Sequence, residues 1–126
     1  GIPLGEAFQL RDDMLGVYGD PQETGKPAGD DLREGKRTAL VAIAWERADA
    51  FQRDLLRQHL GDPAITPSMV DALRDVITET GAQAAVEQMI DDRTATCREV
   101  IAAMDIDEQT RAAFDRLLIL ATRRSA

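Results

Sequence analysis

The sequence is poor in the residues that several classes of protein require. Its single cysteine, Cys97, excludes an intrachain disulfide and gives no evidence for an oxidising compartment. Aromatic residues make up only 4% of the 126 residues, and β-branched runs are few. No apolar run is long enough to span a bilayer and no signal peptide is visible, so we expect a cytoplasmic protein.

Basic residues are also outnumbered, with 15 lysines and arginines against 23 acidic residues and a formal net charge of −8. Nucleic-acid binding relies on a basic surface, so this balance argues against a nucleic-acid partner. It is compatible with divalent cations. Helix-forming residues are abundant, and 44% hydrophobic with 30% charged residues suits one soluble globular domain.

Apolar residues recur at helical spacing along most of the chain, and no strand, hairpin signal or internal repeat is visible. The predicted class is therefore all-α. Thr66 and Asp107 are expected to cap helices, and Gly81 to break or kink one. The expected helical stretches are 4–18, 36–60, 66–104 and 107–124. The side chains expected to face inward are Val41, Trp45, Ala48, Phe51, Leu55, Val86, Met89, Ile90, Cys97, Val100, Ile101, Met104, Phe114, Leu117, Leu118 and Ala121.

The stretch 19–35 holds two of the five prolines and four of the nine glycines, without hydrophobic periodicity. We expect a loop, and a loop of this length is usually either functional or disordered. Trp45 and Phe51, which follow it, are interpreted as core or dimer contacts.

An acidic pair interrupts the first helical stretch, "FQLRDDMLGVYGD". At 100° per residue, Gln9, Asp12 and Asp13 share one face, while nearly every other side of the helix is apolar. Burying ionised carboxylates without partners costs several kcal/mol each. Arg11 points elsewhere on the helical wheel, so a divalent metal such as Mg²⁺ is the most economical partner.

The alternative is a solvated acidic face, which is the usual explanation of an isolated pair of aspartates. That interpretation fits Asp91 and Asp92, which lie among other charged residues. The first pair differs in its apolar surroundings and in the residues that follow it.

Two glycine-lysine pairs follow in "TGKPAGDDLREGK": Gly25 with Lys26, and Gly35 with Lys36. A lysine is a compact charge suited to phosphate, and a glycine beside it lets the backbone approach closely. A solvated loop with ordinary surface lysines is the alternative. Carboxylates followed by these pairs fit a metal–diphosphate site better than either part does alone.

The ordered motif resembles the second aspartate-rich region of the trans-prenyltransferases, the polyprenyl (geranylgeranyl- or farnesyl-type) diphosphate synthases. The family pattern is FQ-x-x-DD-x-x-D followed by GK-x-x-G-x-D-x-x-x-GK-x-T. The resemblance covers essentially all 126 residues and implies the C-terminal half of an all-α helical bundle, part of the isoprenoid synthase fold. The matching positions are Phe8, Gln9, Asp12, Asp13, Gly25, Lys26, Gly29, Asp31, Gly35, Lys36 and Thr38.

The resemblance implies a Mg²⁺-dependent active site. Asp12 would ligate Mg²⁺, Asp13 would support that ligation, and Asp31 would assist through the water shell of the metal. The reaction implied is ionisation of an allylic prenyl diphosphate, with Mg²⁺ stabilising the leaving diphosphate. Isopentenyl diphosphate then attacks the allylic cation and adds five carbons.

The resemblance also implies substrate-binding roles. Lys26 and Lys36 would grip the allylic diphosphate, with Lys26 counted among the catalytic residues. Gln9 would lie beside that substrate, and Phe8 would line the pocket wall near it. We expect a homodimer.

Two departures from the family pattern stand out. Gly16 occupies the place of the third aspartate, which implies weaker metal binding or a water in its stead. The first DDxxD motif of the family is absent, and the chain starts with Gly1 in what resembles the interior of a helix. We therefore expect a piece of a longer chain that is inactive alone.

The same departures leave open a non-catalytic partner or regulatory homologue of a synthase. A terpene cyclase on the same fold is disfavoured, because the glycine-lysine loop belongs to the elongating enzymes.

Overall fold

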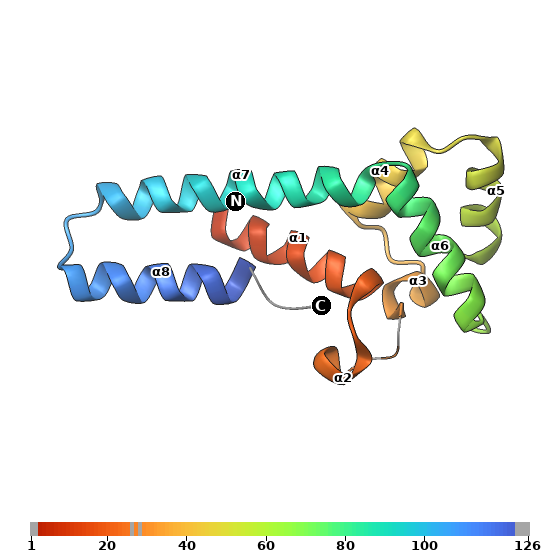
Figure 1. Cartoon of the computed structure of the whole chain (residues 1–126), viewed down its shortest axis with the longest axis horizontal. Coiled ribbons are helices and arrows are strands. Elements are labelled where there is room, and N and C mark those ends of the chain that lie inside the picture. Colours follow the sequence, from red (N-terminus) through yellow and green to blue (C-terminus); the bar gives the residue numbers. More distant parts are fainter. Residues whose placement is uncertain (1–2, 26, 28, 123–126) are drawn as a thin grey trace.

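The fold is known from a computed structural model, which describes residues 3–25, 27 and 29–122. Lys26 and the predicted helix end at 123–124 lie outside these residues. All elements in the described part are helices, in agreement with the predicted all-α class (Figure 1). They are α1 (Pro3–Tyr18), α2 (Pro21–Thr24), α3 (Asp30–Glu34), α4 (Ala39–Arg47), α5 (Ala50–His59), α6 (Pro67–Glu79), α7 (Ala82–Ala103) and α8 (Glu108–Thr122).

The longest helix, α7, organises the arrangement (Figure 1). Helix α8 runs back alongside it, α1 packs against both, and α3 to α6 gather at the other end of α7. The fully buried side chains of the core come from α1 and from α3 to α8. They include Val17, Leu32, Leu40, Leu56, Leu73, Ile77, Val86, Ile90 and Leu118.

Several predicted helix ends are confirmed. The Thr66 side chain accepts a hydrogen bond from the backbone N–H of Met69, and that of Asp107 accepts one from Thr110. Gly81, at φ +87°, separates α6 from α7. Short polar side chains satisfy the free N–H groups at helix starts, and glycine takes left-handed backbone at little cost.

The predicted loop over 19–35 is wrong in part, because it contains the short helices α2 and α3. The Asp20 side chain accepts a hydrogen bond from the N–H of Gln22, and Pro21 occupies the first turn of α2. Gly29 and Gly35 bracket α3 in left-handed conformations. Each helix is shorter than two turns, so hydrophobic periodicity could not reveal it.

The helix predicted over 36–60 is two helices. Asp49 starts α5 with a capping box: its side chain accepts from the N–H of Gln52 at 2.8 Å, and the Gln52 side chain accepts from the N–H of Asp49 at 2.9 Å. This break turns α5, and it leaves Phe51 72% exposed and Trp45 37% exposed. The interpretation of both as core residues is therefore wrong, and their interpretation as dimer contacts stays a prediction.

Replacing Asp49 by alanine is expected to lower the free energy of unfolding by about 1 kcal/mol, the usual cost of losing a helix cap. Asp54 on the same helix is exposed and pairs only within its own turn, with Arg57. Asp54→Ala is therefore the matched control, with a change within about 0.5 kcal/mol. Denaturant unfolding measures both variants, and equal midpoints would show that the capping box contributes nothing.

The inward faces predicted at the end of α7 and on α8 are also wrong in part. Leu118 and Cys97 are buried, whereas Val100 is 54% and Leu117 is 57% exposed, and Met104 and Phe114 are exposed as well. Figure 1 shows these ends of the two helices extending together beyond α1. An apolar stripe predicts a buried face only where another element lies against it.

Among the residues that the structure describes, no helix combines the length and the apolar character needed to cross a membrane.

Candidate functional site

The two aspartates of α1 face two different hollows. Asp13 is 5% exposed and lines a groove with Gln9. Asp12 is partly exposed and lines a separate cleft of about 70 Å³, together with Gly16 and Asp31. The helical wheel predicted that both carboxylates share one face of α1. In the structure, each of the two carboxylates lines a hollow of its own.

Lys36 supplies a positive charge that the sequence argument did not place beside α1. Its Nζ lies 3.8 Å from Oδ1 of Asp13 and 3.7 Å from Oδ2 of Asp31. Gln9 adds a hydrogen bond, donated from Nε2 to Oδ1 of Asp13 at 2.9 Å. A buried carboxylate is stable when ion pairs and hydrogen bonds replace its water. Asp13 therefore needs no metal to be neutralised.

Replacing Lys36 by methionine is expected to lower the free energy of unfolding by about 1–3 kcal/mol, because two buried carboxylates would lose the ammonium group between them. The neighbouring Arg37 is exposed. Arg37→Met should therefore change it by less than about 0.5 kcal/mol. Denaturant unfolding compares the two, and a Lys36 variant as stable as wild type would contradict the structural role of this cation.

Helix α1 is fixed along its length. The guanidinium of Arg11 donates to both carboxylate oxygens of Glu87 on α7, at 2.8 and 2.9 Å, and its Nε donates to the carbonyl of Thr122 at 2.9 Å. At the other end, the hydroxyl of Tyr18 lies 2.8 Å from that of Thr78 on α6. Burial raises the pKa of Tyr18 above its usual value. These contacts therefore tie the helix that carries Asp12 and Asp13 to α6, α7 and α8.

Helix α3 is anchored through Leu32, which is fully buried. The carbonyl of Leu32 also accepts a hydrogen bond from the N–H of Gly61 at 2.9 Å. Gly35 ends α3 with φ +68°, and a Cβ on it would lie 2.9 Å from the Cα of Gly61. The absence of a side chain at Gly35 therefore lets its backbone pack closely against the backbone of Gly61.

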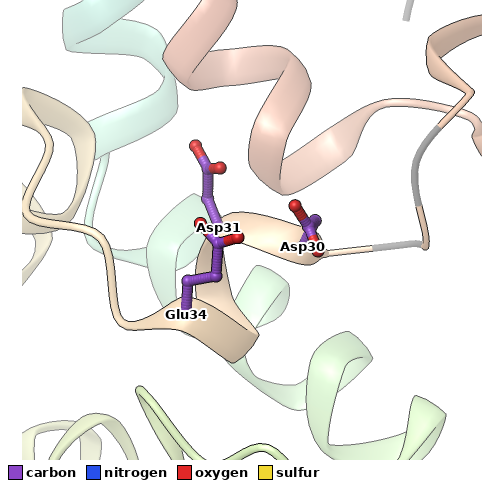
Figure 2. Close-up of side chains that lie close together, drawn as sticks. All are labelled: Asp30, Asp31 and Glu34. Atoms are coloured by element: carbon purple, nitrogen blue, oxygen red, sulfur yellow. The ribbon is translucent and has the colours of Figure 1, made fainter.

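Three carboxylates come together on α3. Asp30 and Asp31 lie on its first turn and Glu34 one turn later, with one oxygen from each within 4.8 Å of the others (Figure 2). Asp30 and Asp31 line the same cleft as Asp12. Hard carboxylate oxygens with room for water are the ligands that Mg²⁺ takes in proteins. The donor set around this cleft therefore fits Mg²⁺.

The structure does not bring all of the predicted site residues together. Gln9 lies at the groove with Asp13, and Phe8 is 43% exposed. Lys26 lies outside the described residues. Sequence reasoning did not place Asp30 and Glu34 among the site residues, and the structure brings their carboxylates close to that of Asp31. The signal for them was present in "GDDLRE", where a helical turn places residues 30, 31 and 34 on neighbouring positions.

The described elements are all helices, and the solved structures that this chain resembles show that it has the all-α fold of the isoprenoid synthases. The family model for polyprenyl synthetase matches residues 1–79, more than half of the chain. The chain belongs to the polyprenyl synthetase family.

Similar proteins agree with this assignment. The chain is 33% identical to geranylfarnesyl diphosphate synthase of Aeropyrum pernix over 119 residues, which cover 94% of this chain and 36% of that protein. The chain spans between about a fifth and about two fifths of the length of these relatives.

Solved structures give the same result. A geranylgeranyl pyrophosphate synthase from Corynebacterium glutamicum, complexed with isoprenyl diphosphate and magnesium, matches with a TM-score of 0.92 and 42% identity, over 97% of this chain and 35% of that one. A polyprenyl synthase from Caulobacter crescentus, complexed with calcium and isoprenyl diphosphate, matches with a TM-score of 0.84 and 31% identity, over 98% and 38%.

Proposed function

We propose that this chain is a C-terminal part of a Mg²⁺-dependent prenyl diphosphate synthase, and that it carries one of the two metal–diphosphate half-sites. The observation that carries the proposal is the position of α3. It folds back against α1, so that Asp31 lines one cleft with Asp12 while Lys36 lies at the edge of the same acidic cluster. Acidic oxygens for a metal and an ammonium group for a diphosphate are thus adjacent.

In the proposed reaction, the carbon–oxygen bond of an allylic prenyl diphosphate breaks and its electron pair leaves with the diphosphate. The double bond of isopentenyl diphosphate then forms the new carbon–carbon bond, and the resulting cation passes a proton to the released diphosphate. Mg²⁺ supplies Lewis-acid stabilisation of the negative charge on the leaving group.

The residues of this chain have different roles in the proposed site. Asp12 holds the metal from α1, and Asp13 keeps its place through Gln9 and Lys36. Lys36, with its side chain 40% exposed, is accessible to a diphosphate. Lys26 and Phe8 complete the binding of the allylic substrate, as the motif implies.

The isoprenyl diphosphate and metal ions in the C. glutamicum and C. crescentus structures support this choice of ligands. In this proposal the protein acts in the cytoplasm as a homodimer. The exposed apolar side chains of α5 and α8, among them Phe51, Leu117 and Leu120, are the surfaces that a second subunit or the rest of the synthase would cover.

The test uses the full-length protein that contains this chain. It is incubated with isopentenyl diphosphate and an allylic diphosphate, with Mg²⁺ or with excess chelator, and the lengthened product is quantified. We expect product only with Mg²⁺. Product formation that chelation leaves intact would refute the metal dependence. Absence of turnover alone, with stimulation of a second synthase on mixing, would instead identify a regulatory homologue.

A further inference from the structure

A second charged hollow lies between α3 and α6, apart from the acidic cleft. Its volume is about 210 Å³, and the described residues that line it are Arg33 from α3 and Pro67, Val70, Asp71 and Arg74 from α6. None of these residues lines the acidic cleft. Two of the five carry a positive charge and one carries a negative charge. The lining is therefore suited to an anion, whereas that of the cleft is suited to a cation.

Both guanidinium groups have N–H donors without an acceptor. Among the described residues, Nη1 of Arg33 and Nη2 of Arg74 are buried and have no hydrogen-bond partner. Nη1 of Arg33 lies 4.0 Å from Oδ1 of Asp30, and Nη1 of Arg74 lies 3.7 Å from Oδ1 of Asp71. Both distances exceed the roughly 2.7–3.2 Å of an N–H···O hydrogen bond. Because a buried donor without an acceptor is costly, an acceptor placed between the two arginines would be stabilised.

Other contacts fix the two arginines at this hollow. Nε of Arg74 donates to the carbonyl of Val17 at the end of α1, and the hydroxyl of Tyr18 donates to the carbonyl of Arg74 at 3.3 Å. Arg33 follows Leu32, whose side chain is fully buried. The two side chains therefore start from fixed positions on either side of the hollow, which lowers the entropic cost of binding a ligand between them.

The hollow is accessible and small. The side chains of Arg33 and Arg74 are 30% and 22% exposed, so a solute can reach both. The side chain of Asp71 is 74% exposed and is free to turn into water when an anion enters. The planar fork of a guanidinium matches the oxygens of a phosphate. Pockets for drug-sized ligands measure about 300–1,000 Å³, so a hollow of this volume suits a small oxyanion.

We propose that Arg33 and Arg74 form an anion site that is separate from the metal–diphosphate site and binds a free phosphate or diphosphate ion. On binding, the two guanidinium groups turn so that their N–H groups donate to oxygens of the anion. Arg33 then compensates less of the charge of Asp30, which lines the acidic cleft and becomes more favourable to a cation. The reaction proposed above releases diphosphate, an anion of this class, but the site does not depend on that reaction.

Isothermal titration calorimetry of the full-length protein with inorganic phosphate and with diphosphate, under excess chelator, tests the site without metal. We expect saturable binding of both anions. Arg33→Gln and Arg74→Gln should each weaken it by about 10–100-fold, the usual weight of a hydrogen bond to a charged group. Arg33→Lys keeps the charge without the fork and should recover only part of the loss.

Arg98→Gln is the matched control, because Arg98 is exposed on α7, a different helix from those of the two arginines. It should leave the affinity for both anions unchanged, and circular dichroism should show all variants folded. Arg74→Gln also loses the hydrogen bond to Val17. Should it fail to fold, Arg33→Gln and Arg33→Lys decide the question.

Lys36→Gln separates this site from the proposed substrate site. If it weakens anion binding while the Arg33 and Arg74 variants bind as wild type does, the anion lies at the metal–diphosphate site, so the inference is overturned and the proposed function stands. Absence of saturable binding by the wild-type protein would also overturn the inference. Binding of isopentenyl diphosphate that depends on Arg33 and is tighter than that of diphosphate would overturn the assignment to a free anion. Turnover that survives chelation would refute the proposed metal dependence and leave this site untouched.

Discussion

Replacing Asp12 by alanine in the full-length protein is expected to lower product formation from isopentenyl and allylic diphosphates by at least about 100-fold. Even groups that only support metal ligands cost about 10–100-fold when they are removed. Asp12 lines one cleft with Asp30 and Asp31, so its loss removes a carboxylate from the proposed metal position.

The control for this variant is Asp92→Ala. Asp92 belongs to the other acidic pair, is exposed on α7 and accepts a hydrogen bond only from its own helix, from Gln88 at 3.0 Å. Turnover of Asp92→Ala should equal that of wild type. Turnover of Asp12→Ala within about threefold of wild type, under saturating Mg²⁺, would show that the acidic pair on α1 has no catalytic part.

Replacing Leu32 by alanine is expected to lower the free energy of unfolding by about 2–5 kcal/mol, the range for truncating a fully buried leucine. Leu32 is 0% exposed and is the main apolar anchor of α3, a helix of only five residues. The cavity would loosen the helix that carries Asp31. We therefore expect weaker Mn²⁺ binding together with the lower stability.

Glu99→Ala provides the comparison, because Glu99 is exposed on α7 and far from α3 in sequence. Its truncation should change the free energy of unfolding by less than about 0.5 kcal/mol. Denaturant unfolding with Mn²⁺ titration measures both properties. A Leu32 variant of wild-type stability would contradict the account of how α3 is held.

The sequence identified the candidate site through the fixed spacing of its motif, but it could not supply the geometry. Asp31 meets α1 at Gly16 because left-handed glycines bracket a five-residue helix, and because that helix buries Leu32. Such a return of the chain depends on contacts between elements. A helical wheel describes only one element at a time.

The same limit explains why the sequence did not predict which residue carries the counter-charge of Asp13. Arg11 is the only basic residue on the helical wheel of α1. In the structure, Arg11 donates hydrogen bonds to Glu87 and to the carbonyl of Thr122. The ammonium of Lys36 comes from after α3 and reaches both Asp13 and Asp31. A pair between separate elements leaves no periodic signal in the sequence.

Helix boundaries were predictable where capping chemistry was considered, as at Thr66, Gly81 and Asp107. The break before α5 was missed although Asp49 and Gln52 have the spacing of a capping box. Apolar residues continue at helical spacing across this break, so periodicity alone predicted one continuous helix.

The central claim is that carboxylates of this chain hold a metal ion against a substrate diphosphate. The most direct measurement is a crystal structure of the full-length protein with Mn²⁺ and a non-ionising thio analogue of an allylic diphosphate, with the metal located by anomalous scattering. We predict a metal ion within about 2.0–2.3 Å of a carboxylate oxygen of Asp12, bridged to the diphosphate, with Asp31 facing it. Diphosphate and metal bound together elsewhere, with no ion at the carboxylate of Asp12, would contradict the account.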